Sequence, residues 1–402
     1  MSTSSVPRPE PAAPSGPRRC PTLPRIARRG VPEGALPALV FFTAVRLAGL
    51  LAVILTNALR GRPLVRNLAH SWDSRWYLHI ATHGYGRLID VTPGGAVQTD
   101  WAFFPLYPAL IRALTTVLPV TPGQSALLIA WAAAVAAAYG VYAVGHRLYG
   151  RGVATALVAL WAVLPHAVEL TIAYTESLFA ALAAWSLYCV LRGRWLWAGG
   201  LAALAGLSRP SGFAVAVAVC LAAAHEAVRQ RGRVPASLWA GALLAPLGWL
   251  GYVLWVGGRT GDLLGGYLRV QSAWNSRFDL GAGALHFLKA LLLHGGVFVY
   301  PAALVIVAAA VLLFALLCLE RAPLALVAFS GVLILLVVGG SGSFSSKPRF
   351  LLPAFPLLIP MARALVRTWR RRPAQALLVL GALTATSLLF GAYVLVVAHS
   401  PL

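Results

Sequence analysis

The sequence predicts an all-α polytopic membrane protein, and three observations support this. Hydrophobic residues make up 59% of the 402 residues and charged residues only 11%, whereas a soluble domain usually carries about 25% charged residues. Apolar runs of roughly 20 residues, long enough to cross a bilayer core, recur along the chain. The net charge is +22, but most arginines stand in short clusters between apolar runs. That pattern indicates membrane topology and no nucleic-acid partner.

The first 35 residues are expected to form a disordered cytoplasmic tail. They are rich in Pro, Ser and Arg and lack apolar periodicity. Arginines precede the first apolar run, 36–58, and short arginine-rich segments stay in the cytoplasm, so the amino terminus is predicted to lie inside. The transmembrane domain is then expected to cover 36–402. Within it, 59–102 should form a first extracytoplasmic loop that carries interfacial helices.

About eleven transmembrane helices are expected in this multi-pass protein of the cell membrane. After the first, the predicted spans are 124–145, 152–170, 172–191, 195–208, 210–226, 237–257, 297–319, 323–340, 350–366 and 374–398. Two further segments, 103–119 and 284–293, are predicted to be interfacial or re-entrant. Alternation of the spans places the arginine-rich loops inside and the rarer ionisable residues outside. Because ionisable residues at a membrane are costly and usually functional, a site is predicted on the extracytoplasmic side.

The densest cluster of reactive side chains lies in the first loop, between His70 and Tyr85. If 71–83 is helical, Asp73, Trp76 and Tyr77 share one face, so a carboxylate stands among aromatic side chains. A carboxylate partly removed from water holds protons more strongly, which suits a general base. The alternative is structural: Asp73 would cap the helix and the aromatic residues would form an interfacial belt.

Two later motifs add charge on the predicted outer side. Tyr174-Thr175-Glu176-Ser177 stands near the outer end of a span, where Glu176 could bind sugar hydroxyls or, equally, pair with Arg209. The segment 208–212, Ser-Arg-Pro-Ser-Gly, breaks two apolar runs and frees backbone N–H groups beside Arg209. Such a break favours an anion.

A second basic turn precedes a late span. Lys347 and Arg349 offer an ammonium and a guanidinium group that could clamp a phosphate, although anchoring to lipid headgroups is the alternative. Arg46 lies inside the first predicted span. It is expected to pair within the bundle or to extend its head group toward the interface.

No metal site and no cofactor are predicted. His79 and His83 are four residues apart but have no further ligand at a suitable spacing. Asp90 and Asp100 do not form the closely spaced acidic pair of a metal-dependent nucleotide-sugar site.

These motifs together resemble the PIG-V-like mannosyltransferases of the GT-C superfamily. The resemblance covers about residues 70–360 and rests on the order and spacing of five segments: Trp72-Asp73 with Trp76-Tyr77, Ala102 to Pro108, Tyr174 to Phe179, Arg192 to Gly212, and Pro348-Arg349-Phe350. It implies a GT-C-like helical bundle with Asp73 as catalytic base. By the same resemblance Tyr174 and Glu176 line the sugar site, and Arg209, Lys347 and Arg349 meet a lipid phosphate. The aromatic residues Trp72, Trp76 and Tyr77 beside Asp73 are further candidates for substrate binding.

The resemblance further implies a polyprenyl-phosphate sugar, most often mannose, as donor, and a lipid, glycan or protein acceptor. A single inverting displacement is expected, in which Asp73 takes the acceptor proton and the arginines stabilise the departing phosphate. Two other classes compete. A lipid or glycan transporter should carry charges near the bilayer midplane, and a non-catalytic envelope scaffold should tolerate Asp73→Asn.

Overall fold

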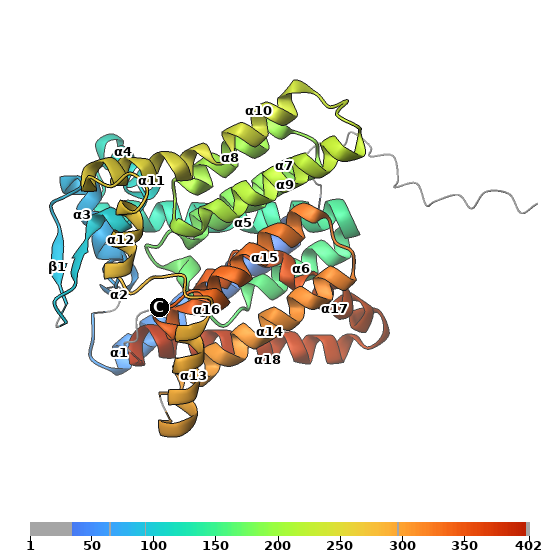
Figure 1. Cartoon of the computed structure of the whole chain (residues 1–402). Helices are drawn as coiled ribbons and strands as arrows, with labels where there is room; N and C mark the ends of the chain where they lie inside the picture. Colours follow the sequence, from blue (N-terminus) through green and yellow to red (C-terminus); the bar gives the residue numbers. More distant parts are fainter. Residues whose placement is uncertain (1–33, 64–65, 93, 296, 399–402) are drawn as a thin grey trace, which may run out of the picture. The chain divides into compact units, whose positions relative to one another are not determined.

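The computed structural model describes residues 34–63, 66–92, 94–295 and 297–398, so the predicted tail lies almost entirely outside the described part. This part is a helical bundle with one small hairpin (Figure 1). The main helices are α1 (Leu36–Leu59), α3 (Ser74–His83), α4 (Leu106–Val117), α5 (Pro122–Tyr149), α6 (Arg151–Ala162), α7 (Glu176–Leu191), α8 (Trp195–Gly206), α9 (Phe213–Arg229), α10 (Ala236–Leu244), α11 (Leu247–Thr260), α12 (Gly266–Ala273), α13 (Ala282–His294), α14 (Val299–Leu319), α15 (Leu324–Gly339), α16 (Lys347–Leu351), α17 (Ile359–Arg371) and α18 (Pro373–Ala392).

The number of membrane spans differs from the expected eleven. Among the described residues, six helical stretches are long and apolar enough to cross a membrane: 36–59, 122–149, 210–229, 236–260, 299–319 and 373–397. A seventh results if the bent pair Phe344–Leu351 and Phe355–Arg371 is one span. The remaining apolar helices have 10 to 17 residues. A run of apolar residues predicts a buried helix as readily as a spanning one, so the count of eleven is not confirmed.

Two of the predicted spans are not continuous helices. The predicted span 152–170 ends as helix α6 at Ala162 and continues as a short 3-10 turn, η2 (Ala167–Thr171). The predicted span 350–366 is bent by 77° between α16 and α17. Pro353 and Pro356 lie at this bend, and proline cannot continue the backbone ladder of a helix. The two segments expected to be interfacial, 103–119 and 284–293, form the short helices α4 and α13.

Small residues allow the central helices to pack closely. An added Cβ at Gly140 of α5 would lie 2.9 Å from the Cβ of Ala184 on α7, and one at Gly199 of α8 would lie 2.2 Å from the carbonyl oxygen of Gly241 on α10. Lipid tails are as apolar as leucine, so close backbone approach and dispersion hold helices together in a bilayer. Helices α5, α7, α8 and α10 pack against one another in series, and Glu176 stands at the start of α7.

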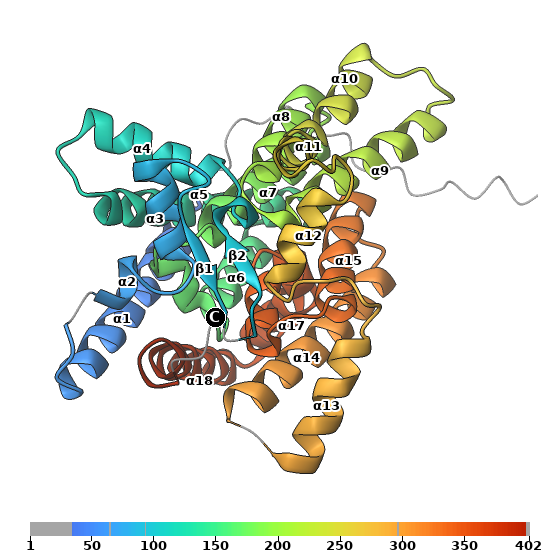
Figure 2. The same cartoon turned by 60° about the vertical axis from the view of Figure 1, so that its left-hand side comes forward.

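One end of the bundle collects the irregular elements of the first loop. Helix α2 (Arg66–Ala69), helix α3 and the antiparallel hairpin β1 (Ile89–Val91) and β2 (Val97–Thr99) lie there together, with α12 nearby (Figures 1 and 2). Asp100 is buried behind the hairpin and accepts hydrogen bonds from the N–H groups of Gly86, Arg87 and Leu88. A carboxylate satisfied by several backbone donors is well suited to fix a loop.

Candidate active site

Asp73 stands at the start of α3 but does not cap it. Among the described residues its side chain makes no capping hydrogen bond; Oδ2 instead lies 2.9 Å from Nη2 of Arg349. The preceding residue, Trp72, has a φ of +43°, a conformation that is uncommon for a bulky residue. The Asp73 side chain is 25% exposed. The carboxylate is therefore held by a cation and still accessible.

The start of α7 is hydrogen-bonded to the start of α3. The Asp73 N–H donates to the Tyr174 hydroxyl at 3.3 Å, and the Ser74 hydroxyl donates to the carbonyl of Ala173 at 3.0 Å. The guanidinium of Arg349 lies over the Tyr174 ring, 5.4 Å from its centroid. Segments about 100 residues apart in sequence are thus fixed against each other beside the carboxylate of Asp73.

Arg209 approaches from the break between α8 and α9. Its backbone is extended, and the 3-10 turn η3 (Pro210–Gly212) follows before α9 begins. The turn packs tightly: a Cβ at Gly212 would lie 2.2 Å from the carbonyl oxygen of Ala205. Only glycine fits at this contact without a backbone shift. The break predicted from the segment 208–212 is confirmed.

Glu176 bridges the two arginines. Its Oε1 lies 2.7 Å from Nη1 of Arg209 and 3.7 Å from Nε of Arg349. The first contact is close, but its angle is not that of a hydrogen bond. Both guanidinium groups also lie over the ring of Phe350, at 5.4 and 5.1 Å from the centroid. Glu176 and Arg209 are buried. Of the two roles expected for Glu176, sugar binding or an ion pair with Arg209, the structure shows the ion pair.

Asp73, Glu176, Arg209 and Arg349 therefore form one chain of ion pairs, which we call the ion-pair cluster. Two carboxylates balance two guanidinium groups. Because the pairs are mostly shielded from water, their attraction is stronger than that of surface pairs, and removal of one partner would leave a buried charge uncompensated. The cluster offers a partly exposed base next to positive charge.

The aromatic residues of α3 lie beneath the site. Trp76 stacks on Phe103 with ring centroids 5.5 Å apart, and Tyr77 meets Phe103 edge-on at 5.1 Å. The Tyr77 hydroxyl contacts Oγ1 of Thr175 at 3.4 Å. Burial raises the pKa of the Tyr77 hydroxyl well above its usual value, so this group stays neutral. In this structure Trp76 and Tyr77 are buried supports of α3, while Trp72 is half-buried next to Asp73.

Lys347 is not part of the ion-pair cluster. Its ammonium donates a hydrogen bond to the carbonyl of Gly340 at 2.8 Å and lies over the ring of Phe344. The acid that acts on it electrostatically is Asp279. Of the three predicted phosphate ligands, the structure brings Arg209 and Arg349 together and places Lys347 elsewhere.

Two ionisable residues near the cluster were not among the predicted site residues. His166 and Glu169 are 3% and 0% exposed, and the charges of Arg349, Asp73 and Glu176 act on Glu169. The available sequence signal was an acid and a histidine inside an apolar run, Leu164-Pro-His-Ala-Val-Glu-Leu170. In a membrane protein such residues are functional candidates by default.

The other polar candidates have structural partners. Asp90 pairs with Arg75 at 2.6 Å on the surface, and His79 and His83 stack on each other along α3. Within the described ranges, no group of three or more His, Cys, Asp or Glu side chains could hold a metal ion.

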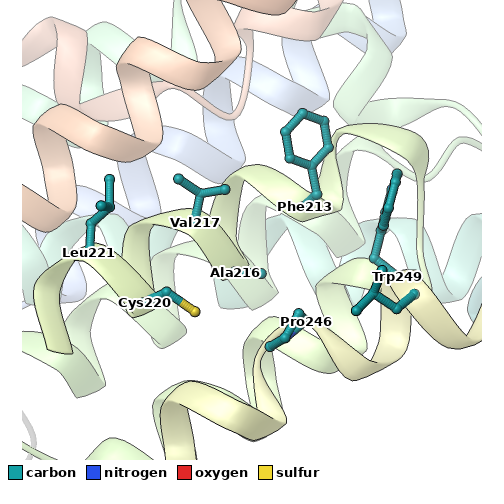
Figure 3. A pocket seen from close by; sticks show the side chains of 8 residues that line it. Phe213, Ala216, Val217, Cys220, Leu221, Pro246 and Trp249 are labelled. Carbon is teal, nitrogen blue, oxygen red and sulfur yellow. The ribbon is translucent and has the colours of Figure 1, made fainter. Parts of the chain in front are cut away.

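Two pockets in the described part of the chain are lined by residues other than the members of the ion-pair cluster. One, of about 320 Å³, is an apolar groove between α9 and the α10–α11 helices, with Phe213 and Trp249 at one end (Figure 3). The other, of about 450 Å³, lies between α3 and the start of α5 and is lined by His70, Arg75, His79 and Thr82, among others.

Comparisons with solved structures establish the fold class. The chain is similar to the oligosaccharyltransferase of Archaeoglobus fulgidus in the apo form, with a TM-score of 0.52 and 16% identity over 92% of this chain and 57% of that chain. It is also similar to ArnT from Cupriavidus metallidurans in the apo state, with a TM-score of 0.51 and 12% identity over 86% of this chain and 62% of that chain. The chain has the GT-C fold.

A third similar structure is the archaeal oligosaccharyltransferase AglB in complex with an inhibitory peptide and a dolichol-phosphate, with a TM-score of 0.52 and 16% identity. The matched region covers 91% of this chain and 56% of the AglB chain. The chain thus spans little more than half the length of these proteins, and at such identities the likeness concerns the fold alone. Comparisons with protein-family models and with curated proteins find no match.

Proposed function

We propose that this protein is a membrane glycosyltransferase that moves a sugar from a polyprenyl-phosphate donor to an extracytoplasmic acceptor with inversion. The family resemblance of the sequence selects mannose as that sugar. The observation that carries the proposal is the ion-pair cluster. It joins a carboxylate that remains 25% exposed to two guanidinium groups that can receive a phosphate. A base that accepts the acceptor proton and positive charge that stabilises the leaving phosphate are two groups that serve a glycosyl transfer from a lipid phosphate.

In the proposed reaction, Asp73 is the general base. The acceptor hydroxyl gives its proton to the Asp73 carboxylate while its oxygen attacks the anomeric carbon of the donor. The bond from that carbon to the phosphate oxygen breaks, and the phosphate leaves with the electron pair. Because the attack comes from the face opposite the leaving group, a β-linked donor gives an α-linked product.

Arg349 couples the two halves of this reaction. At rest it neutralises Asp73 at 2.9 Å and also faces Glu176. When Asp73 becomes protonated, its negative charge disappears at the moment when the leaving phosphate gains one. The guanidinium group can then turn its full charge to the phosphate, whose oxygens match its fork of donors. Stabilisation that increases in the transition state accelerates the reaction.

A lipid-linked donor fits the chemical surroundings. The sites of a nucleotide sugar commonly use a metal held by acidic residues, and the acids of this cluster face arginines instead. One similar GT-C structure is described as a complex with a dolichol-phosphate. Lys347, whose ammonium bonds to the carbonyl of Gly340 and not to the cluster, would meet the donor at a different point from Arg349.

The test uses the purified full chain in phospholipid nanodiscs. It is incubated with radiolabelled polyprenyl-phosphate mannose, polyprenyl-phosphate glucose or GDP-mannose, together with membranes from cells lacking the protein as the source of acceptors. Label should move to membrane acceptors from polyprenyl-phosphate mannose and not from GDP-mannose. Transfer from the glucose donor alone would refute the choice of mannose, and transfer from GDP-mannose would refute the lipid-linked donor. In a separate assay with the protein in sealed proteoliposomes, movement of intact donor across the bilayer without sugar transfer would indicate a transporter.

A further inference from the structure

Arg46 stabilises the irregular turn that follows α6, where Pro165 already prevents the helix from continuing. This residue lies inside the long apolar helix α1 and is buried. Its guanidinium donates hydrogen bonds to the carbonyls of Ala162 and Ala167, which lie on either side of the break between α6 and η2. A buried arginine within a membrane span is costly. Arg46 offsets this cost with two hydrogen bonds that fix the break between α6 and η2.

The break presents His166 and Glu169 on one side. The Glu169 N–H donates to the carbonyl of His166 at 3.1 Å, the spacing of a 3-10 turn. Since such a turn has three residues per rotation, side chains at positions i and i+3 are eclipsed. The turn is fixed further by the Trp131 indole, which donates to the carbonyl of Thr171 at 2.9 Å.

The polar atoms on this side are buried and make no internal hydrogen bonds. Within the described part of the chain, both carboxyl oxygens of Glu169 and both ring nitrogens of His166 lack a hydrogen-bond partner, and so does Nη1 of Arg349. Buried polar atoms are nearly always hydrogen-bonded in native proteins. Several such atoms gathered around one arginine indicate that a polar ligand is recognised here.

The charges around Glu169 favour a protonated carboxyl group over an ionised one. Asp73 and Glu176 already neutralise Arg209 and Arg349, so an ionised Glu169 would be a third negative charge in a site that excludes water. Burial and neighbouring carboxylates both favour the protonated form of a carboxyl group. A protonated carboxyl can donate an O–H hydrogen bond, as the buried aspartic acid of ketosteroid isomerase does.

We propose that Glu169 acts as a neutral acid that donates a hydrogen bond to a phosphate oxygen of the donor lipid, next to Arg349. The assignment rests on the proposed function, since it names a further ligand of the same phosphate. His166, eclipsed with Glu169, supplies a second neutral hydrogen-bonding group on the same wall. An ionised Glu169 would repel the phosphate, whereas the neutral acid adds a donor without adding charge.

The test compares Glu169→Gln with Glu169→Leu in the full chain, using binding of radiolabelled undecaprenyl phosphate, which carries no sugar. Glutamine is neutral and can donate through its amide, so the dissociation constant of undecaprenyl phosphate from the Glu169→Gln variant should stay within about threefold of wild type. Leucine has no hydrogen-bond donor. The dissociation constant of the Glu169→Leu variant should therefore rise about tenfold or more, the loss expected for one hydrogen bond to a charged group. Leucine suits an apolar interior, so the variant should still fold, and its melting temperature is measured alongside.

The matched control is Glu320→Leu. Unlike Glu169, this acid pairs with an arginine, Arg363, at 2.9 Å, and it lies at the loop after α14. It should leave undecaprenyl phosphate binding unchanged. If Glu169→Gln weakens binding as much as Glu169→Leu, the neutral-acid role is wrong, and if Glu169→Leu binds like wild type, Glu169 is no ligand. These outcomes, in which wild type binds undecaprenyl phosphate, contradict only the role of Glu169. If wild type itself does not bind undecaprenyl phosphate, the proposed function fails as well.

Discussion

Nη2 of Arg349 lies 2.9 Å from Oδ2 of Asp73, so the proposed base and a proposed phosphate ligand are in direct contact before any substrate is bound. The donor phosphate and the Asp73 carboxylate must therefore compete for the same guanidinium group. A donor that attracts Arg349 would release Asp73 for proton transfer. This predicts that the donor binds before the acceptor hydroxyl is deprotonated.

Arg349→Lys should separate charge from geometry. Lysine keeps the positive charge but cannot reach Asp73, Glu176 and a phosphate with one planar fork. We expect kcat/KM for polyprenyl-phosphate mannose to fall by about a hundredfold, the scale seen when one charge-stabilising donor is lost. Lys347→Met is the comparison: because Lys347 bonds to Gly340 and not to the cluster, its effect should be clearly smaller. Equal losses for the two variants would contradict this division of roles.

Glu176→Gln should destabilise the protein. It leaves the buried Arg209 without a full counter-charge, and breaking a buried pair typically costs about 3–5 kcal/mol. The melting temperature in nanodiscs reports this loss. The double variant Glu176→Gln with Arg209→Met should recover much of the stability, because the unpaired charge is removed, yet remain inactive. If the double variant is no more stable than the single one, the two residues do not act as a pair.

Gly212→Ala should damage the break that positions Arg209. The new methyl group would meet the Ala205 carbonyl at 2.2 Å, and such overpacking usually costs about 1–3 kcal/mol. Gly251→Ala in α11 is the control, because nothing lies within 4 Å of its added Cβ. Thermal unfolding of both variants should show a loss only for Gly212→Ala. A loss of the same size at Gly251 would point to a general effect of glycine replacement.

Arg46→Met should disturb the turn that carries His166 and Glu169. The buried carbonyls of Ala162 and Ala167 lose their donor, and an unsatisfied buried group costs about 1–3 kcal/mol. Undecaprenyl phosphate binding should weaken together with stability. Unchanged binding in a destabilised Arg46→Met protein would show that the turn is structural only.

All four residues of the ion-pair cluster were candidates from the sequence, for a physical reason. Asp73, Glu176, Arg209 and Arg349 each stand at the end or break of an apolar run, where an ionisable residue can be tolerated, and alternation of the runs placed all four on one side. The GT-C fold is confirmed by the structural neighbours. The side of the membrane on which the cluster lies stays a prediction.

Other features could not be predicted from spacing. Lys347 and Arg349 look like one basic clamp in the sequence, but on helix α16 residues two apart point to nearly opposite sides, so only Arg349 reaches Asp73. His166 and Glu169 lie in an apolar run that Pro165 interrupts, and Arg46, more than a hundred residues earlier, holds the resulting 3-10 turn through the carbonyls of Ala162 and Ala167. Hydrophobicity also does not distinguish short buried helices from spans, which explains why eleven spans were expected.

The most direct test of the central claim is the transfer of radiolabelled mannose from polyprenyl-phosphate mannose to membrane acceptors by wild type and by Asp73→Asn at matched expression and matched melting temperature. Asparagine keeps the shape of the side chain but cannot accept the proton, and loss of a general base typically costs about 10²–10⁴-fold in rate. The account predicts transfer by wild type and a loss of that size in the variant. Equal transfer by both proteins would contradict the assignment of Asp73 as the base.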